Sequence, residues 1–330
     1  MERDLERQIR DKFGWIADRG RDGRITSFSQ RRLELNLLET KALIREAYRK
    51  LGRTMRADLK DLAELESRFA PRSVDSTLVK FGLDGIGVGI AGGPLLTAIV
   101  DRRPFQGHLL REWAAKLDAD TYTRISGALR SGMANNETID QIVRRIRGTK
   151  AKKYADGVLQ ASRREVTAVV RTAHAHVANA ARLQGYQEQK AYIRCLMWES
   201  VLDDRTSPAC QVRDGLLYTL DGAPIGHKIP SLGFPPIHWN CRSVVVAQFW
   251  SANRLAMGMT GEQRAAFGGP VDAGMTYGEW LARQDAATQD RVLGVTRARA
   301  FRAGKVEFGD FFDDRGLFLT IDEIEELEAA

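Results

Sequence analysis

The chain has 330 residues, enough for about two domains, and its 43% hydrophobic and 28% charged residues are the proportions of an ordinary soluble protein. Three cysteines are too few for a disulfide framework, so we expect assembly in a reducing cytoplasm. The N-terminus has no apolar core and so does not read as a signal peptide, and the longest apolar run, 86–100, is too short and glycine-rich for a transmembrane helix. The net charge of +7 is uneven, because residues 101–200 hold 18 Lys and Arg against 10 Asp and Glu while the last thirty hold 3 against 9, which fits either a surface for a polyanion or solvated helix faces.

A long amphipathic helix is predicted from Ser27 to Pro71. Apolar residues recur at three- and four-residue steps between Phe28 and Phe69, interleaved with Arg, Lys and Glu. Pro71 is expected to end the helix, because proline lacks a backbone donor and its ring clashes with the preceding turn. The glycine-rich segment 82–93 then predicts a hinge, since its GxGxxG spacing lacks the strand and helix that nucleotide binding needs.

Helical patterns continue through the middle of the chain. Helices are predicted over 105–117, 121–129, 135–148 and 158–182. Asn135, Asn136 or Thr138 can cap the third of these helices and Gly148 closes it, while Gly185 is expected to end the fourth.

Basic residues gather on and between the last two of these helices. They are candidates for facing double-stranded DNA through phosphate contacts that are non-specific and sensitive to salt. These candidates are Arg144, Arg145, Arg147, Lys150, Lys152, Lys153, Arg163, Arg164 and Arg171.

The segment 198–243 differs from the rest of the chain, because it holds two of the three cysteines, two of the five histidines and five of the nine prolines. Proline fixes φ and removes a backbone donor, so the segment predicts a loop-rich β-ribbon, which we call the knuckle. Its structural residues are expected to come together in space. They are Trp198, Asp203, Asp204, Arg205, Thr206, Cys210, Pro235, Pro236, His238, Asn240, Cys241 and Arg242.

One interpretation of the knuckle is a zinc site. Zinc prefers four tetrahedral ligands, and Cys210, His238 and Cys241 offer three of the favoured kind. Asp203, Asp204 or a water molecule would have to supply the fourth ligand.

The other interpretation is a knuckle held by polar contacts alone. Arg205 or Arg242 can pair with Asp203 or Asp204, and Asn240 can bond the backbone, with the two cysteines as small buried apolar residues. The missing fourth soft ligand favours this interpretation, so we expect no cofactor and keep zinc as the alternative.

After the knuckle we expect a closing strand at 244–250, a short helix at 262–267, a helix at 277–289 and an acidic tail. The expected fold is mainly α with a small β-ribbon subdomain (α+β) and long N-terminal helices. The expected divisions are an N-terminal helical region 1–103, a domain 104–320 (helices 104–190, ribbon 198–250, C-terminal helices 260–320) and the tail 321–330.

Three blocks of these residues resemble the phage Mu F-like minor head proteins, a family that includes SPP1-type head morphogenesis proteins. The blocks are the helix end 170–182, the knuckle and the segment 280–304, and together they cover about 104–320. The chain departs from the family at Ser207 and Ser243, where many members have cysteine.

The resemblance implies a minor capsid protein of a tailed bacteriophage, assembled in the host cytoplasm and located in the virion, inside the head near the portal. It implies action in head morphogenesis, with handling or delivery of packaged DNA as a further role. The implied partners are the portal protein, the interior of the major capsid or scaffold, and packaged double-stranded DNA, with no membrane in the assembled head.

The alternative is a phage-encoded enzyme or toxin packaged in the head, of the ADP-ribosyltransferase or nuclease kind. Glu326 and Glu328 form a Glu-x-Glu pair, but they lie in an acidic run. A third reading, a free DNA-binding regulator, lacks the spacing of a helix-turn-helix or zinc finger. Nothing supplies nucleophile, base and orienting group together, so we expect no catalytic residues and no enzyme activity.

Overall fold

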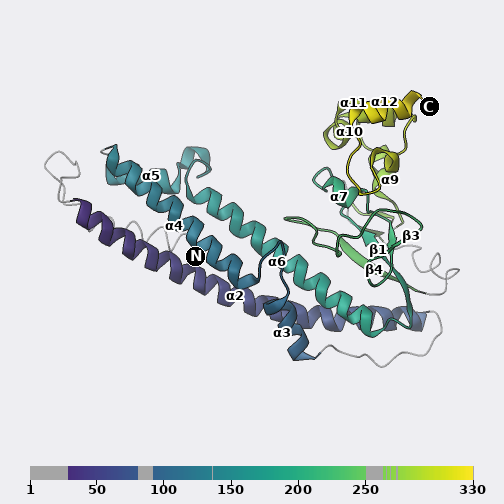
Figure 1. Ribbon diagram of the computed structural model, residues 1–330, viewed down its shortest axis with the longest axis horizontal. Helices are drawn as coiled ribbons and strands as arrows, with labels where there is room; N and C mark the ends of the chain where they lie inside the picture. Colours follow the sequence, from purple (N-terminus) through teal and green to yellow (C-terminus); the bar gives the residue numbers. More distant parts are fainter. Residues whose placement is uncertain are drawn as a thin grey trace. The chain divides into compact units, whose positions relative to one another are not determined.

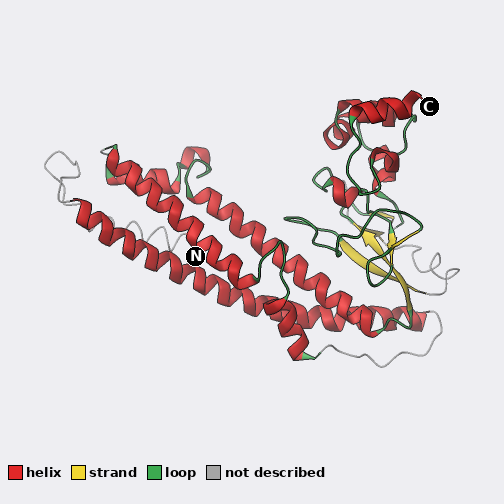
Figure 2. Ribbon diagram, in the orientation of Figure 1, coloured by secondary structure: helices red, strands yellow, loops and turns green. Residues whose placement is uncertain are grey.

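The computed structural model describes residues 29–80, 92–135, 137–249, 263–264, 266–267, 269–272 and 274–329. Over these residues the fold is mainly helical with a small antiparallel sheet, as predicted (Figure 2). The chain forms two compact units: unit 1 comprises Met1–Asp61 and Val100–Ala173, and unit 2 comprises Leu62–Ile99 and His174–Ala330. The domain boundaries predicted at 103 and 320 were drawn from sequence patterns, whereas the two units are defined by packing, so these boundaries stay predictions. Most of the predicted hinge 82–93 lies outside the described residues.

The first described helix, α2 (Ser29–Lys80), is longer than predicted. Its buried apolar residues keep helical spacing, as shown by Ile44, Tyr48 and Leu59. The prediction that Pro71 ends the helix is wrong, because the helix continues through it. The proline is buried. Tertiary burial therefore outweighs a propensity cost of about 3 kcal/mol.

Unit 1 is a helical bundle in which α2, α4 and α6 lie side by side (Figure 1). The helices that complete the first half of the fold are α3 (Gly93–Arg102), α4 (Leu110–Ala134), α5 (Ile139–Arg147), the 3₁₀ turn η1 (Lys150–Lys152) and α6 (Leu159–Glu188). The two short helices predicted over 105–129 are one helix, α4, since no glycine or proline separates them.

Buried hydroxyl groups join the three long helices of unit 1. The Tyr48 hydroxyl lies 2.7 Å from Thr121 Oγ1, which donates to Ser162 Oγ at 2.9 Å. Beside them, Arg124 on α4 forms a bidentate pair with Glu165 on α6. The bundle therefore has a fixed register along its core.

The short helix α5 ends at the predicted Gly148, and its start uses Thr138, one of the three caps that the sequence offered. Thr138 caps its start in a reciprocal capping box with Gln141, and Gly148 closes it with φ +88. A Cβ on Gly157 would lie 2.5 Å from the carbonyl oxygen of Arg147, so the turn that follows α5 requires glycine there.

Unit 2 contains a four-stranded antiparallel sheet of order β3-β2-β1-β4. Its strands are β1 (Ile193–Glu199), β2 (Leu217–Tyr218), β3 (Pro224–Ile225) and β4 (Val244–Phe249). The register pairs Trp198 with Val245 and confirms the predicted closing strand. The prediction that Gly185 ends α6 is wrong, since this glycine is buried and the helix continues to Glu188.

The C-terminal part of unit 2 differs from its prediction in two places. The expected helix 262–267 is wrong, because Gln263 and Arg264 pair with the next strand. The expected helix 277–289 is two helices, because Asp285 caps the second by accepting from the Thr288 amide at 2.7 Å. The elements here are β5 (Gln263–Arg264), β6 (Val271–Asp272), α9 (Tyr277–Ala282), α10 (Ala286–Leu293), α11 (Val295–Arg302), η2 (Phe308–Phe311) and α12 (Ile321–Ala329).

Two apolar cores support unit 2. One lies under the sheet around Trp198 and Tyr218, and the other lies among the C-terminal helices around Trp280 and Phe311. Leu202, at the start of the knuckle turn, belongs to the second core. Among the described helices, none combines the length and apolarity that crossing a bilayer requires.

Candidate functional site

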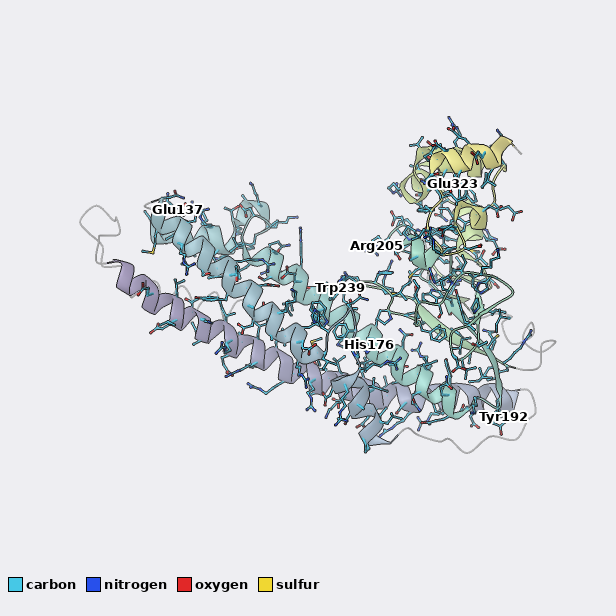
Figure 3. The ribbon with its side chains drawn as sticks, in the orientation of Figure 1. Glu137, His176, Tyr192, Arg205, Trp239 and Glu323 are labelled. Carbon is cyan, nitrogen blue, oxygen red and sulfur yellow. The ribbon has the colours of Figure 1, made fainter. Side chains whose placement is uncertain are left out.

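The knuckle is built from two segments that the sheet brings together. The first runs from the end of β1 through the turn 203–206 into the single helical turn α7 (Pro208–Gln211), and the second, 235–242, leads into β4. Trp198 is fully buried between them, and its indole nitrogen donates to Ser200 Oγ at 3.1 Å. Figure 3 labels Arg205 and Trp239, one from each segment.

A bidentate ion pair clamps the two segments. Both Arg242 guanidinium nitrogens donate to the Asp203 carboxylate at 2.6 Å, and Thr206 Oγ1 donates to the same carboxylate at 3.1 Å. Burial disfavours the charged carboxylate, but the hydrogen bonds and charge of Arg242 outweigh burial and hold the pKa of Asp203 below its usual value. Of the two predicted arginines, Arg242 makes the clamp, whereas Arg205, with an 80% exposed side chain, meets the Asp203 carboxylate at a longer 3.5 Å.

Asp204 points to a different partner from its neighbour. Its carboxylate lies 3.3 Å from the Arg291 guanidinium of α10. Both aspartates that the sequence offers as a fourth zinc ligand are therefore engaged by arginines.

A cluster of thiols and an imidazole lies beside the clamp. Cys210 Sγ lies 3.1 Å from His238 Nε2 and 3.7 Å from Cys241 Sγ, and one ligand atom of each residue lies within 4.8 Å of the others. Both thiols are almost fully buried, while His238 is partly exposed. We call these three residues the thiol–imidazole cluster.

The cluster shares its protons unevenly. The hydrogen bond with Cys210 lowers the pKa of Cys241, and the hydrogen bond of Cys241 raises the pKa of His238. The pKa of Cys210 is raised, because it donates to Cys241 and because burial disfavours its thiolate. Of the two thiols, Cys241 is therefore the one whose deprotonated form the surroundings favour.

Two serines complete the surroundings of the cluster. Ser207 Oγ lies 2.7 Å from His238 Nε2, and Ser243 Oγ lies 3.0 Å from Ser200 Oγ. These are the two positions at which many members of the resembled family carry cysteine. Ser207 therefore brings a hydroxyl group to the position from which a cysteine would reach the imidazole.

The remaining predicted knuckle residues line the second segment. Pro235 is buried, Pro236 is partly buried, and the peptide bond between them is cis. Asn240 has φ +57, a left-handed conformation that asparagine tolerates better than most residues. The tight backbone here carries His238 and Cys241 to the same side of the loop.

Sequence reasoning missed the polar core on the other side of α7. The Asp214 carboxylate is fully buried and receives the backbone amides of Ser200 and Tyr277 at 2.7 and 2.8 Å. Arg264 from β5 donates to it at 2.6 and 3.1 Å, and also to the carbonyls of Met275 and Ser200. No local signal announces this pair, because its members are 50 residues apart.

A buried arginine was also missed. Arg213 is fully buried and donates to the carbonyl oxygens of Ala209, Pro230 and Arg315. Burial lowers the pKa of Arg213. Arg213 therefore ties the helical turn α7 to the loops at Pro230 and Arg315, which is a structural role.

The DNA-facing candidates all lie in unit 1, and most are exposed. Arg145 is bound by Glu137 at 3.1 Å, and Arg147 stacks on the Tyr154 ring at 4.6 Å. Arg163 is partly buried. The remaining candidates are all exposed, and we call them the basic surface: Arg144, Lys150, Lys152, Lys153, Arg164 and Arg171.

The burial of the two thiols bears on what chemistry the knuckle can offer. A cysteine nucleophile needs an accessible thiolate with an adjacent base, whereas the two thiols here are about 1% and 3% exposed. Two buried sulfurs and a partly exposed imidazole nitrogen at contact distance are groups that soft metal ions bind, or that can close a hydrogen-bonded core.

Residues 123–246 match the family described as phage Mu protein F like protein. The match runs from within α4 to β4, includes both knuckle segments and confirms the resemblance seen in the sequence. No match was found among curated proteins or among solved structures. The match covers 124 of the 330 residues and makes this region similar to a family of phage proteins.

Proposed function

We propose that this chain, whose residues 123–246 form a phage Mu F-like domain, is a minor head protein that binds inside the capsid near the portal and acts in head morphogenesis. The family match is the observation that carries the proposal. The clamp between Asp203 and Arg242 supports a structural role, because it locks two segments of the matched region that are 39 residues apart. A chain held in this way can present fixed surfaces to portal and capsid subunits.

The test is a phage with a nonsense codon in this gene, complemented by plasmid-borne protein. Without the chain we expect heads that are malformed or non-infectious. With it, quantitative mass spectrometry should find the chain in purified heads at far fewer copies than the capsid protein, with crosslinks to the portal protein. Absence from both proheads and virions contradicts the proposal, and crosslinks to tail proteins alone contradict the portal position.

We also propose that the basic surface of unit 1 contacts packaged double-stranded DNA. Between 139 and 171 the chain has nine Lys and Arg against three Asp and Glu, and one of those carboxylates, Glu165, is already paired with Arg124. Lys150, Lys152 and Lys153 are exposed together around η1. Such a surface binds phosphates without reading sequence.

Binding to double-stranded DNA of unrelated sequences at several salt concentrations tests this contact. Changing Lys150, Lys152 and Lys153 to Gln should reduce the slope of log affinity against log salt by about 3, since each phosphate contact contributes about 0.9. A matched variant with the same change in net charge replaces exposed basic residues of unit 2, namely Arg283, Arg299 and Lys305, by Gln. Equal effects of the two variants would reduce the interaction to net charge alone and refute the assigned surface.

A further inference from the structure

The strongest unassigned feature of the structure is the donor set of the thiol–imidazole cluster. Among the described residues, Cys210, His238 and Cys241 are the group whose ligand atoms converge within 4.8 Å. With zinc–sulfur bonds of about 2.3 Å, two sulfurs at adjacent corners of a tetrahedron lie about 3.8 Å apart. The two cysteine sulfurs lie 3.7 Å apart, which matches that edge and is far from the roughly 2.0 Å of a disulfide.

The orientation of the imidazole also suits a metal ligand. His238 Nδ1 donates to the Trp239 carbonyl oxygen at 2.9 Å. This bond places the proton on Nδ1 and leaves the lone pair of Nε2 facing Cys210 Sγ at 3.1 Å. A carbonyl that fixes the tautomer in this way is the usual outer partner of a histidine that binds a metal.

The structure also decides what stands at the fourth corner. Asp203 is held by Arg242 and Asp204 by Arg291, so neither carboxylate is available. Ser207 Oγ lies 2.7 Å from His238 Nε2, on the same side of the imidazole as the sulfurs. A neutral serine hydroxyl is a weak zinc ligand, but it can hold a water molecule by hydrogen bonding.

We propose that Cys210, His238 and Cys241 bind a zinc ion through two sulfurs and one nitrogen, with a water molecule beside Ser207 as the fourth ligand. Two thiolates and an imidazole select a soft or borderline metal over magnesium or calcium, which require oxygen ligands. The ion ties α7 to the loop before β4, segments that the chain separates by about 30 residues. The metal stabilises the knuckle and carries out no reaction.

Metal analysis of protein purified without chelator tests the site, together with titration by cobalt. We expect a single zinc ion per chain and, after replacement by cobalt, thiolate-to-cobalt charge-transfer absorption. Cys210→Ser and Cys241→Ser should abolish both signals, and His238→Gln should weaken binding at least about tenfold, which is 1.4 kcal/mol. Cys195→Ser is the matched control, since Cys195 is equally buried but lies in β1 outside the cluster.

A variant that is expected to bind zinc more tightly tests the proposal even if the Cys210, Cys241 and His238 substitutions unfold the protein. Ser207→Cys places a third sulfur beside the imidazole and should lower the zinc dissociation constant by at least about tenfold, or 1.4 kcal/mol. Metal-free protein with three reactive thiols after unfolding, and no cobalt signal on titration, overturns the proposal. So does a Cys210–Cys241 disulfide found by mass spectrometry in freshly purified protein, or zinc retained when both cysteines are replaced.

Discussion

Replacing Asp203 by Asn should loosen the knuckle without changing its size. Asp203 is 6% exposed and accepts two hydrogen bonds of 2.6 Å from Arg242, one of 3.1 Å from Thr206 and one of 3.1 Å from the Arg205 amide. Asparagine keeps the shape but turns an amide nitrogen, a donor, toward the guanidinium. The change therefore removes the charge and opposes donor to donor.

The magnitude follows from the burial of the two partners. Removing one member of a fully buried pair costs about 3–5 kcal/mol, and a surface pair contributes about 0–1 kcal/mol. Asp203 is buried but Arg242 is 37% exposed and can turn to solvent, so we expect a loss of about 2 kcal/mol in the free energy of unfolding. For a unit of this size the melting temperature falls by about 4–8 °C.

Denaturant and thermal unfolding of the whole chain provide the measurement, with Asp204→Asn as the matched control. Asp204 is the adjacent carboxylate, is exposed, and pairs with Arg291 at the surface, so its replacement should cost no more than about 0.5 kcal/mol. If the two variants unfold within about 0.5 kcal/mol of each other, the clamp is not what holds the two segments together.

The same pair predicts a pH dependence. The pKa of Asp203 is lowered in the folded chain, so its contribution is fully present above the pKa of an unfolded aspartate, about 3.9. That contribution is lost as pH falls through the folded value. The stability difference between wild type and Asp203→Asn should therefore be constant near neutral pH and shrink below about pH 4; a difference that grows on acidification would show that the sign is wrong.

Three further changes test other parts of the structure. Asp214→Ala leaves Arg264 charged and buried, so the free energy of unfolding measured in urea should fall by about 3–5 kcal/mol. The double variant Asp214→Leu with Arg264→Met should recover much of that loss. If the effects of the two changes simply add, the coupling between these residues is refuted. Gly157→Ala should destabilise unit 1 by about 1–3 kcal/mol in thermal unfolding, because the added Cβ would lie 2.3 Å from the backbone. Gly127→Ala is the control: this glycine is exposed within α4, its Cβ would meet no atom within 4 Å, and the change should stabilise unit 1 by about 1 kcal/mol. Thr138→Ala should cost about 1 kcal/mol in the same assay, and no change would mean that the cap does not hold α5.

Features governed by near neighbours were predictable from the sequence. The mainly α fold, the end of α5 at Gly148 and the strand at 244–250 all follow from periodicity and caps within a few residues. The sequence also offered Thr138 as one of three candidate caps for α5. The family was also recognisable, because the knuckle residues stand in an unusual string. Proline and glycine misled the same reasoning at Pro71 and Gly185, where burial overrides local propensity.

Choice of partner was decided only by the tertiary structure. Asp203 meets its neighbour Arg205 at only 3.5 Å, whereas Arg242, 39 residues away, donates to it at 2.6 Å, and Asp204 binds Arg291. The Asp214–Arg264 pair has no local signal at all, and it explains why Arg264 lies in a strand where a helix was expected. Local patterns report the free energy of a few neighbouring residues, whereas a buried charge takes whichever partner the folded chain brings to it, since leaving it unpaired costs more than any local preference.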